Sequence, residues 1–231
     1  MQAREKILLI VFAIASLGNL MSSLLPIPFL NELTKPFLLL SLSAAWYESS
    51  NFLSTRFSRI IAGAFFFSWI GDLMLMLVAS SWSNHAPFFI LGLGSFLIAH
   101  LFFIWAFWLW KGNRQGLLQQ KIWLLLPFLL YWSLLLNILW AGLGDLLIPV
   151  LAYSLVLICM TANAHNLGKM LPKPYFSYLS VGTILFVLSD SLIATNKFSG
   201  TALPLASFWI MLTYIVAQYL IYLGAKGMTR N

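Results

Sequence analysis

Two aspartates stand inside apolar runs, where an ionised side chain is unfavourable. Asp72 lies in "FSWIGDLMLM" and Asp190 lies in "LFVLSDSLIA". An aspartate near the centre of a membrane helix opposes insertion by about 2.5 to 3.5 kcal/mol, so its presence there indicates a function. Burial favours the neutral form of a carboxyl, and a second carboxyl nearby drives the two protonation states apart. Such a pair supplies a proton donor and a base at neutral pH.

This combination is used to hydrolyse acetal-like bonds. One carboxylic acid protonates the substrate, and a carboxylate activates water against an oxocarbenium-like transition state. The sequence contains no serine-nucleophile elbow, no HExxH motif, no cysteine–histidine pair and no glycine-rich phosphate loop. Three histidines on separate segments give a weak metal signal, so we expect neither a metal nor a cofactor. The single cysteine, Cys159, is interpreted as a packing residue.

Several polar residues inside the apolar runs share one spacing. The pairs separated by 118 positions are Asp72 and Asp190, His100 and Gln218, and Lys35 and Tyr153. A duplicated unit of four helices, parallel because four is an even number, predicts this common register. The sequence therefore favours an internal repeat of two units of four helices each, in which these polar residues are the best-preserved positions.

Each accompanying polar residue also has a structural interpretation. His100 and Gln218 could hydrogen-bond two helices together instead of contacting a substrate. Lys35 could bind a lipid phosphate, neutralise one aspartate, or extend to the membrane interface without a specific partner. Tyr153 and Tyr214 could donate hydrogen bonds into the same cavity or to backbone carbonyls.

The elements that must position these residues are membrane helices. Of the 231 residues, 61% are hydrophobic and 8% are charged, which is too apolar for a soluble domain. The apolar runs lack the alternation of barrel strands, so we expect an all-α, polytopic integral membrane protein. Residues 1–231 are predicted to form a single transmembrane domain with eight spans, the first retained and not cleaved. The predicted spans cover residues 7–25, 34–50, 59–80, 87–110, 122–142, 146–167, 176–196 and 203–224.

The positive charges predict the orientation of these spans. If the N- and C-termini are both cytoplasmic, 11 of the 13 Lys and Arg residues lie on the cytoplasmic side, and only Lys35 and Lys197 lie on the outer side. This orientation places Asp72 and Asp190 about 10 to 12 Å below the outer interface. Because the basic residues are scattered singly, no nucleic-acid partner is expected.

Other residues near the predicted helix ends have conventional interpretations. Four acids are expected to be reached by solvent, namely Glu5, Glu32, Glu48 and Asp145. Seven aromatic residues are interpreted as interfacial anchors: Trp46, Tyr47, Trp82, Trp110, Trp123, Tyr175 and Tyr178.

Six stretches resemble, in order, the motif series of the YhhN family, the bacterial and animal lysoplasmalogenases. They are "ELTKPFLLLSL", "AFFFSWIGDLMLML", "GLGSFLIAHLFFIWAF", "IPVLAYSLVLICM", "LFVLSDSLIATNKF" and "TYIVAQYLI". Together they cover about residues 32–224, and their combination is much more specific than any one of them.

The resemblance implies an eight-helix membrane hydrolase that cleaves the vinyl ether bond of lysoplasmalogens. The products would be a fatty aldehyde and glycerophosphoethanolamine or glycerophosphocholine. The catalytic aspartates of the family fall on Asp72 and Asp190, and the residues of the sequence do not decide which is the acid. The accompanying polar positions fall on Lys35, His100, Tyr153, Tyr214 and Gln218. Lys35 is expected to bind the head-group phosphate of the lysophospholipid.

Two other functions remain open at this point. A proton-coupled transporter of small molecules or lipids also uses paired acids and internal repeats, although neither aspartate motif contains the proline typical of broken transporter helices. A non-catalytic lipid-binding or scaffold protein is the third alternative. The compact chain favours a bacterial inner (cell) membrane, and nothing in the sequence predicts an oligomeric state.

Overall fold

The fold was analysed in a computed structural model that describes residues 3–25, 27–79, 85–168 and 170–229. These residues are helical with no strand among them, which confirms the predicted all-α class. They form two compact units, with the boundary between Ala106 and Phe107 inside a continuous helix. Trp82, which we expected to be an interfacial anchor, lies outside the described residues.

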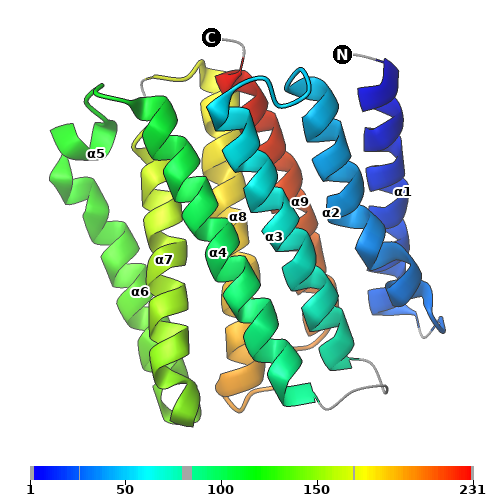
Figure 1. Cartoon of the computed structure of the whole chain (residues 1–231). Helices are drawn as coiled ribbons and strands as arrows, with labels where there is room; N and C mark the ends of the chain where they lie inside the picture. Colours follow the sequence, from blue (N-terminus) through cyan, green and yellow to red (C-terminus); the bar gives the residue numbers. More distant parts are fainter. Residues whose placement is uncertain (1–2, 26, 80–84, 169, 230–231) are drawn as a thin grey trace. The chain divides into compact units, whose positions relative to one another are not determined.

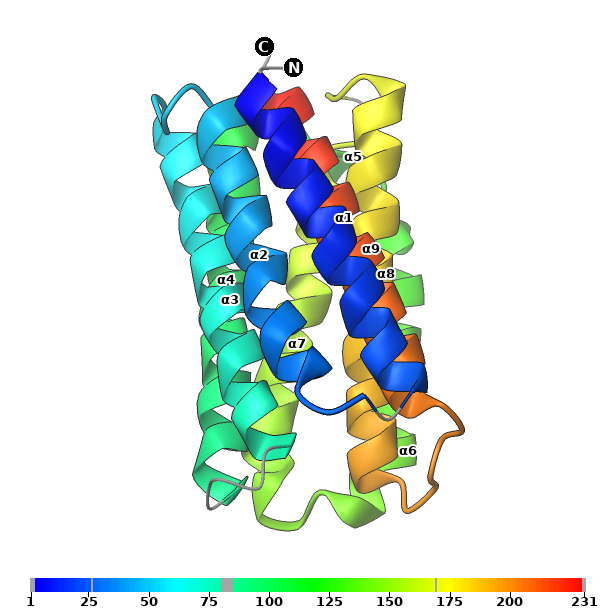
Figure 2. The same cartoon turned by 90° about the vertical axis from the view of Figure 1, so that its right-hand side faces the viewer.

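The first unit contains helices that run alternately up and down (Figure 1). Its elements are α1 (Ala3–Leu24), α2 (Leu30–Ser49), α3 (Arg56–Ala79) and α4 (His85–Lys111), the last of which continues into the second unit. Helix α1 packs against α2, and α2 packs against α3 (Figure 2). At one end of the unit, the Arg4 guanidinium lies 3.9 Å from the Glu48 carboxylate, which brings the start of α1 to the end of α2.

The second unit is arranged around three long helices. Its elements are α5 (Leu117–Gln120), α6 (Leu126–Leu139), α7 (Leu147–His165), α8 (Lys173–Phe198) and α9 (Ala206–Met228), with 3₁₀ turns at Ile122–Leu125, Trp140–Gly142 and Gly144–Leu146. Helix α8 packs against both α7 and α9. The Leu118 amide donates to the Asn166 side-chain oxygen at 2.9 Å, which fastens α5 to the end of α7.

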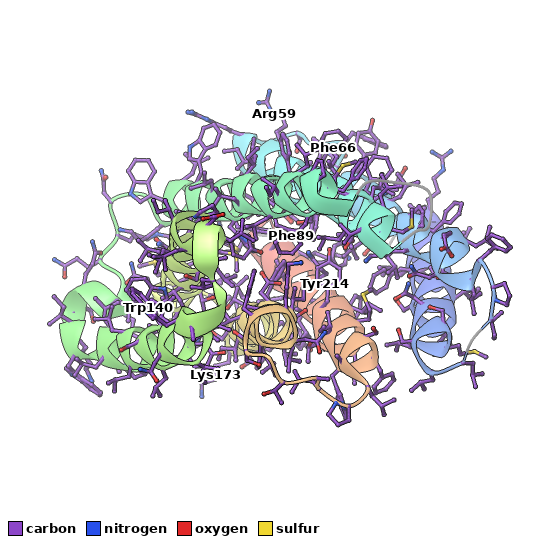
Figure 3. All side chains as sticks on the ribbon, turned by 90° about the horizontal axis from the view of Figure 1, so that it is seen from below. Arg59, Phe66, Phe89, Trp140, Lys173 and Tyr214 are labelled. Atoms are coloured by element: carbon purple, nitrogen blue, oxygen red, sulfur yellow. The ribbon has the colours of Figure 1, made fainter. Side chains whose placement is uncertain are left out.

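Seven segments of the described chain are long and apolar enough to cross a membrane. They are Ala3–Leu24, Arg56–Val78, Pro87–Lys111, Ile122–Gly142, Gly144–His165, Lys173–Phe198 and Ala206–Met228. Helix α2 is absent from this set, and its first two turns carry Asn31, Glu32, Thr34 and Lys35. Large apolar side chains such as Phe66, Leu134 and Trp140 remain exposed, as lipid contact requires (Figure 3 labels Phe66 and Trp140).

Two of the residues expected at polar surfaces are in fact buried. The Trp46 side chain is fully buried, and its indole N–H donates to the Ser58 carbonyl at 2.8 Å, so it joins α2 to α3 and does not anchor an interface. Glu5, expected in contact with solvent, is 2% exposed. Both expectations were wrong because position near a helix end does not specify which face of the helix the residue occupies.

Helices α8 and α9 approach each other through two glycines. A Cβ atom added to Gly182 would lie 2.9 Å from the Ile221 backbone nitrogen and 3.0 Å from the Ala217 carbonyl oxygen. A Cβ at Gly224 would lie 2.9 Å from the Leu179 backbone nitrogen. Small residues allow close backbone contact of this kind, which stabilises helix pairs in membranes by van der Waals packing.

Gly182→Ala is therefore expected to lower the midpoint of thermal unfolding in detergent, by an overpacking penalty of about 1 to 3 kcal/mol. Gly94→Ala is the matched control, because a Cβ there meets no atom within 4 Å. Gly94→Ala should leave the midpoint unchanged or raise it, since alanine favours the helix. Equal midpoints for the two variants would contradict the close contact.

Candidate functional site

The two aspartates lie in different units. Asp72 is on α3 of the first unit and is 3% exposed, whereas Asp190 is on α8 of the second unit and is half-buried. Of the other predicted site residues, Lys35 and His100 belong to the first unit, and Tyr153, Tyr214 and Gln218 belong to the second. Each aspartate can therefore be described with the partners that its own unit provides.

In the first unit, Asp72 is accompanied by a cation. The half-buried Lys35 of α2 interacts electrostatically with the Asp72 carboxyl on α3. The Trp69 indole N–H donates to the Pro36 carbonyl at 2.9 Å, one residue from Lys35 and one helical turn from Asp72. This hydrogen bond joins α2 to α3 near Lys35 and Asp72.

A glycine beside Asp72 brings α4 close to α3. A Cβ added to Gly71 would lie 2.6 Å from the Phe96 ring, and the Ser95 hydroxyl donates to the Phe67 carbonyl at 2.6 Å. The fully buried His100 lies further along α4, between Ser95 and Phe102, which packs at Gly63. His100 is consequently more than one helical turn from the level of Asp72.

In the second unit, Asp190 is accompanied by a phenol. The buried Tyr153 of α7 donates its hydroxyl hydrogen to Oδ2 of Asp190 on α8. The adjacent Ser191 accepts a hydrogen bond from the Tyr131 hydroxyl of α6 at 2.8 Å and donates to the Val187 carbonyl at 2.7 Å. Helices α6 and α7 thus contact α8 through polar groups at the level of Asp190.

Helix α9 contributes Tyr214 and Gln218, which lie beside parts of α8 that precede Asp190. The Tyr214 ring packs edge-on against Phe186 of α8, with ring centroids 5.6 Å apart (Figure 3 labels Tyr214). Gln218 is fully buried one turn further along α9, next to Ala217, which contacts Gly182. Since Gly182 precedes Asp190 by eight residues on α8, Gln218 lies about 12 Å from the level of Asp190.

The Gln218 amide has an unusual environment. Neither its nitrogen nor its oxygen has a hydrogen-bond partner within the described ranges. A buried polar group without a partner destabilises a fold by about 1 to 3 kcal/mol, so most native structures avoid it. The amide can therefore offer one acceptor and two donor hydrogens to a bound molecule.

The two aspartate pairs occupy matching positions. Lys35 and Asp72 of the first unit are each 118 residues before Tyr153 and Asp190 of the second. The common spacing identified these residues in the sequence, but it did not show that Asp72 interacts with Lys35 and that Asp190 accepts a hydrogen bond from Tyr153. Trp69 and Tyr131, which support the two pairs, were not predicted. Trp69 could have been found from its position one helical turn before Asp72, whereas nothing in the sequence pointed to Tyr131.

The site residues can transfer protons and hydrogen-bond a ligand. They offer two carboxyls, an ammonium, two phenols, an imidazole and an amide. No group of three His, Cys, Asp or Glu side chains that could hold a metal ion occurs in the part of the chain that the structure describes.

Comparison with known proteins places these residues in a family. The model of the YhhN family matches residues 30–225, a range that includes both aspartates. The lysoplasmalogenase TMEM86B of Homo sapiens is 33% identical over 172 residues, which cover 74% of this chain and 66% of that protein. The lysoplasmalogenase TMEM86B of Sus scrofa is 35% identical over 170 residues, covering 74% of this chain and 65% of that protein.

A bacterial relative gives a similar match. The lysoplasmalogenase of Mycobacterium bovis is 30% identical over 173 residues, which cover 73% of this chain and 61% of that protein. The alignments thus span slightly less than two thirds of the length of these relatives. No solved structure is significantly similar to the chain. Since the family model covers most of the sequence and all the residues that surround the two aspartates, the chain belongs to the YhhN family.

Proposed function

We propose that this protein is a lysoplasmalogenase, a membrane hydrolase that cleaves the vinyl ether bond of lysoplasmalogens by two-aspartate acid–base catalysis. The observation that carries the proposal is that both intramembrane aspartates have a polar partner on a neighbouring helix, Lys35 for Asp72 and Tyr153 for Asp190. The names of the mammalian and mycobacterial relatives support the same activity. The substrates would be alkenyl glycerophosphoethanolamine and glycerophosphocholine.

The chemistry begins with protonation of carbon. A carboxylic acid gives its proton to the vinyl carbon that is not bonded to oxygen. The other vinyl carbon, which is bonded to the ether oxygen, becomes part of an oxocarbenium ion. The second carboxylate stabilises this cation and takes a proton from water as the water adds. The resulting hemiacetal then loses the glycerol oxygen and becomes the fatty aldehyde. One water molecule is consumed, and both aspartates return to their starting states.

The remaining polar residues are proposed to bind the substrate. Tyr153 and Tyr214 supply hydroxyl groups. His100, more than one helical turn from the level of Asp72, and Gln218, about two turns from that of Asp190, supply nitrogen and oxygen atoms. Lys35 was expected either to bind the phosphate or to neutralise an aspartate. Its interaction with Asp72 favours the neutralising role. The unpaired amide of Gln218 supports a binding role for this residue over one in which it joins two helices.

The proposed arrangement in the membrane has eight spans with both termini in the cytoplasm of a bacterial cell. Helix α2 would be the eighth span, because its 20 residues can cross the hydrocarbon layer. In the first unit, Arg4 lies beside Glu48 at the end of α2, and α3 begins soon afterwards with Arg56 and Arg59. In the second, the Trp110 indole donates to the Met228 carbonyl at 2.9 Å, which brings Lys111 and Lys226 to one end. Such clustering of basic residues supports a cytoplasmic assignment of these ends.

The internal repeat is proposed to be a duplication of four helices. Beyond the polar pairs, the same spacing of 118 relates Ala64 to Gly182 and Ala106 to Gly224. All four residues are buried, so each half keeps small residues at matching levels of its last two helices. A shared ancestor for the halves explains why packing and polar positions repeat together although overall identity is weak.

Asp72→Asn and Asp190→Asn should each reduce aldehyde release by at least about 10²- to 10⁴-fold, the usual contribution of an acid or base. The measurement is the formation of free fatty aldehyde from lysoplasmenylethanolamine by detergent-purified protein. Asp145→Asn is the control, because Asp145 is exposed in a turn outside the site. Near wild-type turnover of either aspartate variant would remove that residue from the mechanism. Uptake of the lipid into sealed vesicles without aldehyde would instead indicate a transporter.

Gln218→Met should raise thermal stability while raising the KM for the lysolipid. The substitution keeps the side-chain volume and removes a buried amide that has no hydrogen-bond partner in the described residues. Unfolding midpoints and initial rates over a range of substrate concentrations measure the two effects. Lower stability with unchanged kinetics would show that Gln218 has a structural role.

The eighth span can be tested by labelling single cysteines in a Cys159→Ser background. If α2 crosses the membrane, a cysteine at Ile27 should react with an impermeant maleimide added to intact cells. A cysteine at Ser54, just beyond the other end of α2, should react only after permeabilisation. Labelling of both positions from the same side would mean that α2 does not span.

A further inference from the structure

Basic side chains without an acidic neighbour occur in residues 111–121, at one end of the second unit. This basic segment, "KGNRQGLLQQK", begins with the last residue of α4, includes α5 and ends before the 3₁₀ turn that leads into α6. Its cations are Lys111, Arg114 and Lys121, and none of them forms a salt bridge with a residue that the structure describes. The preference of cytoplasmic loops for basic residues accounts for the presence of these cations but not for the way in which the segment is folded.

The acidic side chains of the second unit lie towards its other end. They are Asp145, which directly precedes α7, and Asp190, which is about 25 Å along α8 from Lys173 at its start. The basic segment is fastened to the opposite end of α7, where the Leu117 amide donates to the Asn166 carbonyl at 3.0 Å. Salt screens charges over roughly 8 to 10 Å, so neither carboxyl compensates the positive charge of the segment.

The segment is folded around the ammonium group of Lys111. This side chain is 9% exposed and donates to the Arg114 carbonyl at 2.8 Å, the Gly112 carbonyl at 3.2 Å and Oε1 of Gln119 at 3.4 Å. Oε1 of Gln119 also accepts a hydrogen bond from the Gly116 amide at 2.9 Å. The partners of this buried cation are therefore neutral oxygens. Since a buried charge is unfavourable without an opposite charge nearby, an external anion would stabilise the loop.

The Arg114 side chain is held in place on the outside of this loop. Its Nε donates to the Lys111 carbonyl at 3.0 Å and its Nη2 donates to the Trp110 carbonyl, while the guanidinium lies over the Trp110 ring, 4.2 Å from the ring centroid. The indole N–H of Trp110 donates in turn to the Met228 carbonyl at 2.9 Å. Arg114 is nevertheless exposed, and its Nη1 has no hydrogen-bond partner in the described part of the chain. A guanidinium fixed in this way binds a phosphate with little further loss of side-chain entropy.

Exposed apolar side chains begin directly after the basic segment. The candidate membrane span that contains α6 starts at Ile122, and Ile122 and Trp123 are 76% and 59% exposed. Lys121 therefore lies at the border between polar and apolar surface, which is the level of the phosphate groups in a lipid leaflet. An acidic protein or a nucleic acid would contact the cations but not these apolar side chains, so the surface as a whole fits a lipid best.

We propose that the basic segment binds the head group of an anionic phospholipid from the adjacent leaflet. Arg114 donates to the phosphate, Lys121 and Lys111 supply further positive charge, and the acyl chains lie along Ile122 and Trp123. Basic residues next to a membrane span attract anionic lipids by about fivefold in affinity for each residue. The bound phospholipid stays intact, so this site does not depend on the proposed function.

Native mass spectrometry of the full chain in detergent tests the lipid preference. Dioleoylphosphatidylglycerol should bind at least about 10-fold more tightly than dioleoylphosphatidylcholine, which has the same chains and phosphate but also a cationic choline. Higher ionic strength should reduce the difference. Equal affinities for the two lipids would overturn the proposal. So would displacement of the lipid by an equal concentration of glycerol 3-phosphate or polyglutamate, which would identify a free phosphate or an acidic protein as the ligand.

Single substitutions test the residues of the segment in the same titration. Arg114→Gln should weaken phosphatidylglycerol binding by about 10-fold, and Lys121→Gln should weaken it by about fivefold. Arg114→Lys keeps the charge but loses the planar group that stacks on Trp110, so it should recover only part of the loss. Arg59→Gln is the matched control, because Arg59 is an exposed arginine of the first unit (Figure 3), and it should leave binding unchanged.

Two results with these variants would overturn the site. One is wild-type affinity in both Arg114→Gln and Lys121→Gln, and the other is an equal loss in Arg59→Gln, which would indicate a general effect of positive charge. Unfolding midpoints measured without lipid show whether each variant is folded. The Lys121 side chain makes no hydrogen bond to a described residue, so Lys121→Gln gives a result even if Arg114→Gln is unstable. Because lipid binding is measured and not aldehyde release, the outcome is independent of the proposed function.

Discussion

A carboxyl group in an apolar helical protein must either keep its proton or lie beside a compensating charge, and this constraint organises the structure around Asp72 and Asp190. Helix α2 presents Lys35 to Asp72, and α7 presents Tyr153 to Asp190. The hydrogen bonds from Trp69 to α2 and from Tyr131 to α8 stabilise the same two regions. Each acid thus has a polar partner on a neighbouring helix of its own unit, which would preorganise it for the proposed catalysis.

The proposed duplication, followed by divergence, would account for the residues around the two aspartates. Small buried residues recur at the spacing of 118 positions, Ala64 with Gly182 and Ala106 with Gly224. The polar residues at this spacing differ in chemistry, with Lys35 against Tyr153 and His100 against Gln218. The proposed acid–base catalysis would need such a difference, because two carboxyls in identical environments would have the same preferred protonation state.

The order and approximate ends of the helices could be predicted from the sequence because apolar runs of this length leave few alternatives. Spacing in the chain also identified Asp72, Asp190 and the residues that pair with them. The sequence could not show that Trp46 is buried or that Glu5 is shielded, because these outcomes depend on which face of a helix meets a neighbour. Neither could it show that Gln218 lies two turns from the level of Asp190, since that depth follows from the contact of α8 with α9.

The close contact of α8 and α9 at their glycines also limits where the alkenyl chain of the proposed substrate could lie. Where Gly182 contacts the backbone of α9 at van der Waals distance, no gap remains for a hydrocarbon chain to pass between α8 and α9. A lysolipid, the proposed substrate, would therefore have to enter between other helices at this level. Under the proposed function, a preference for tail length would then depend on residues outside the contact of α8 with α9.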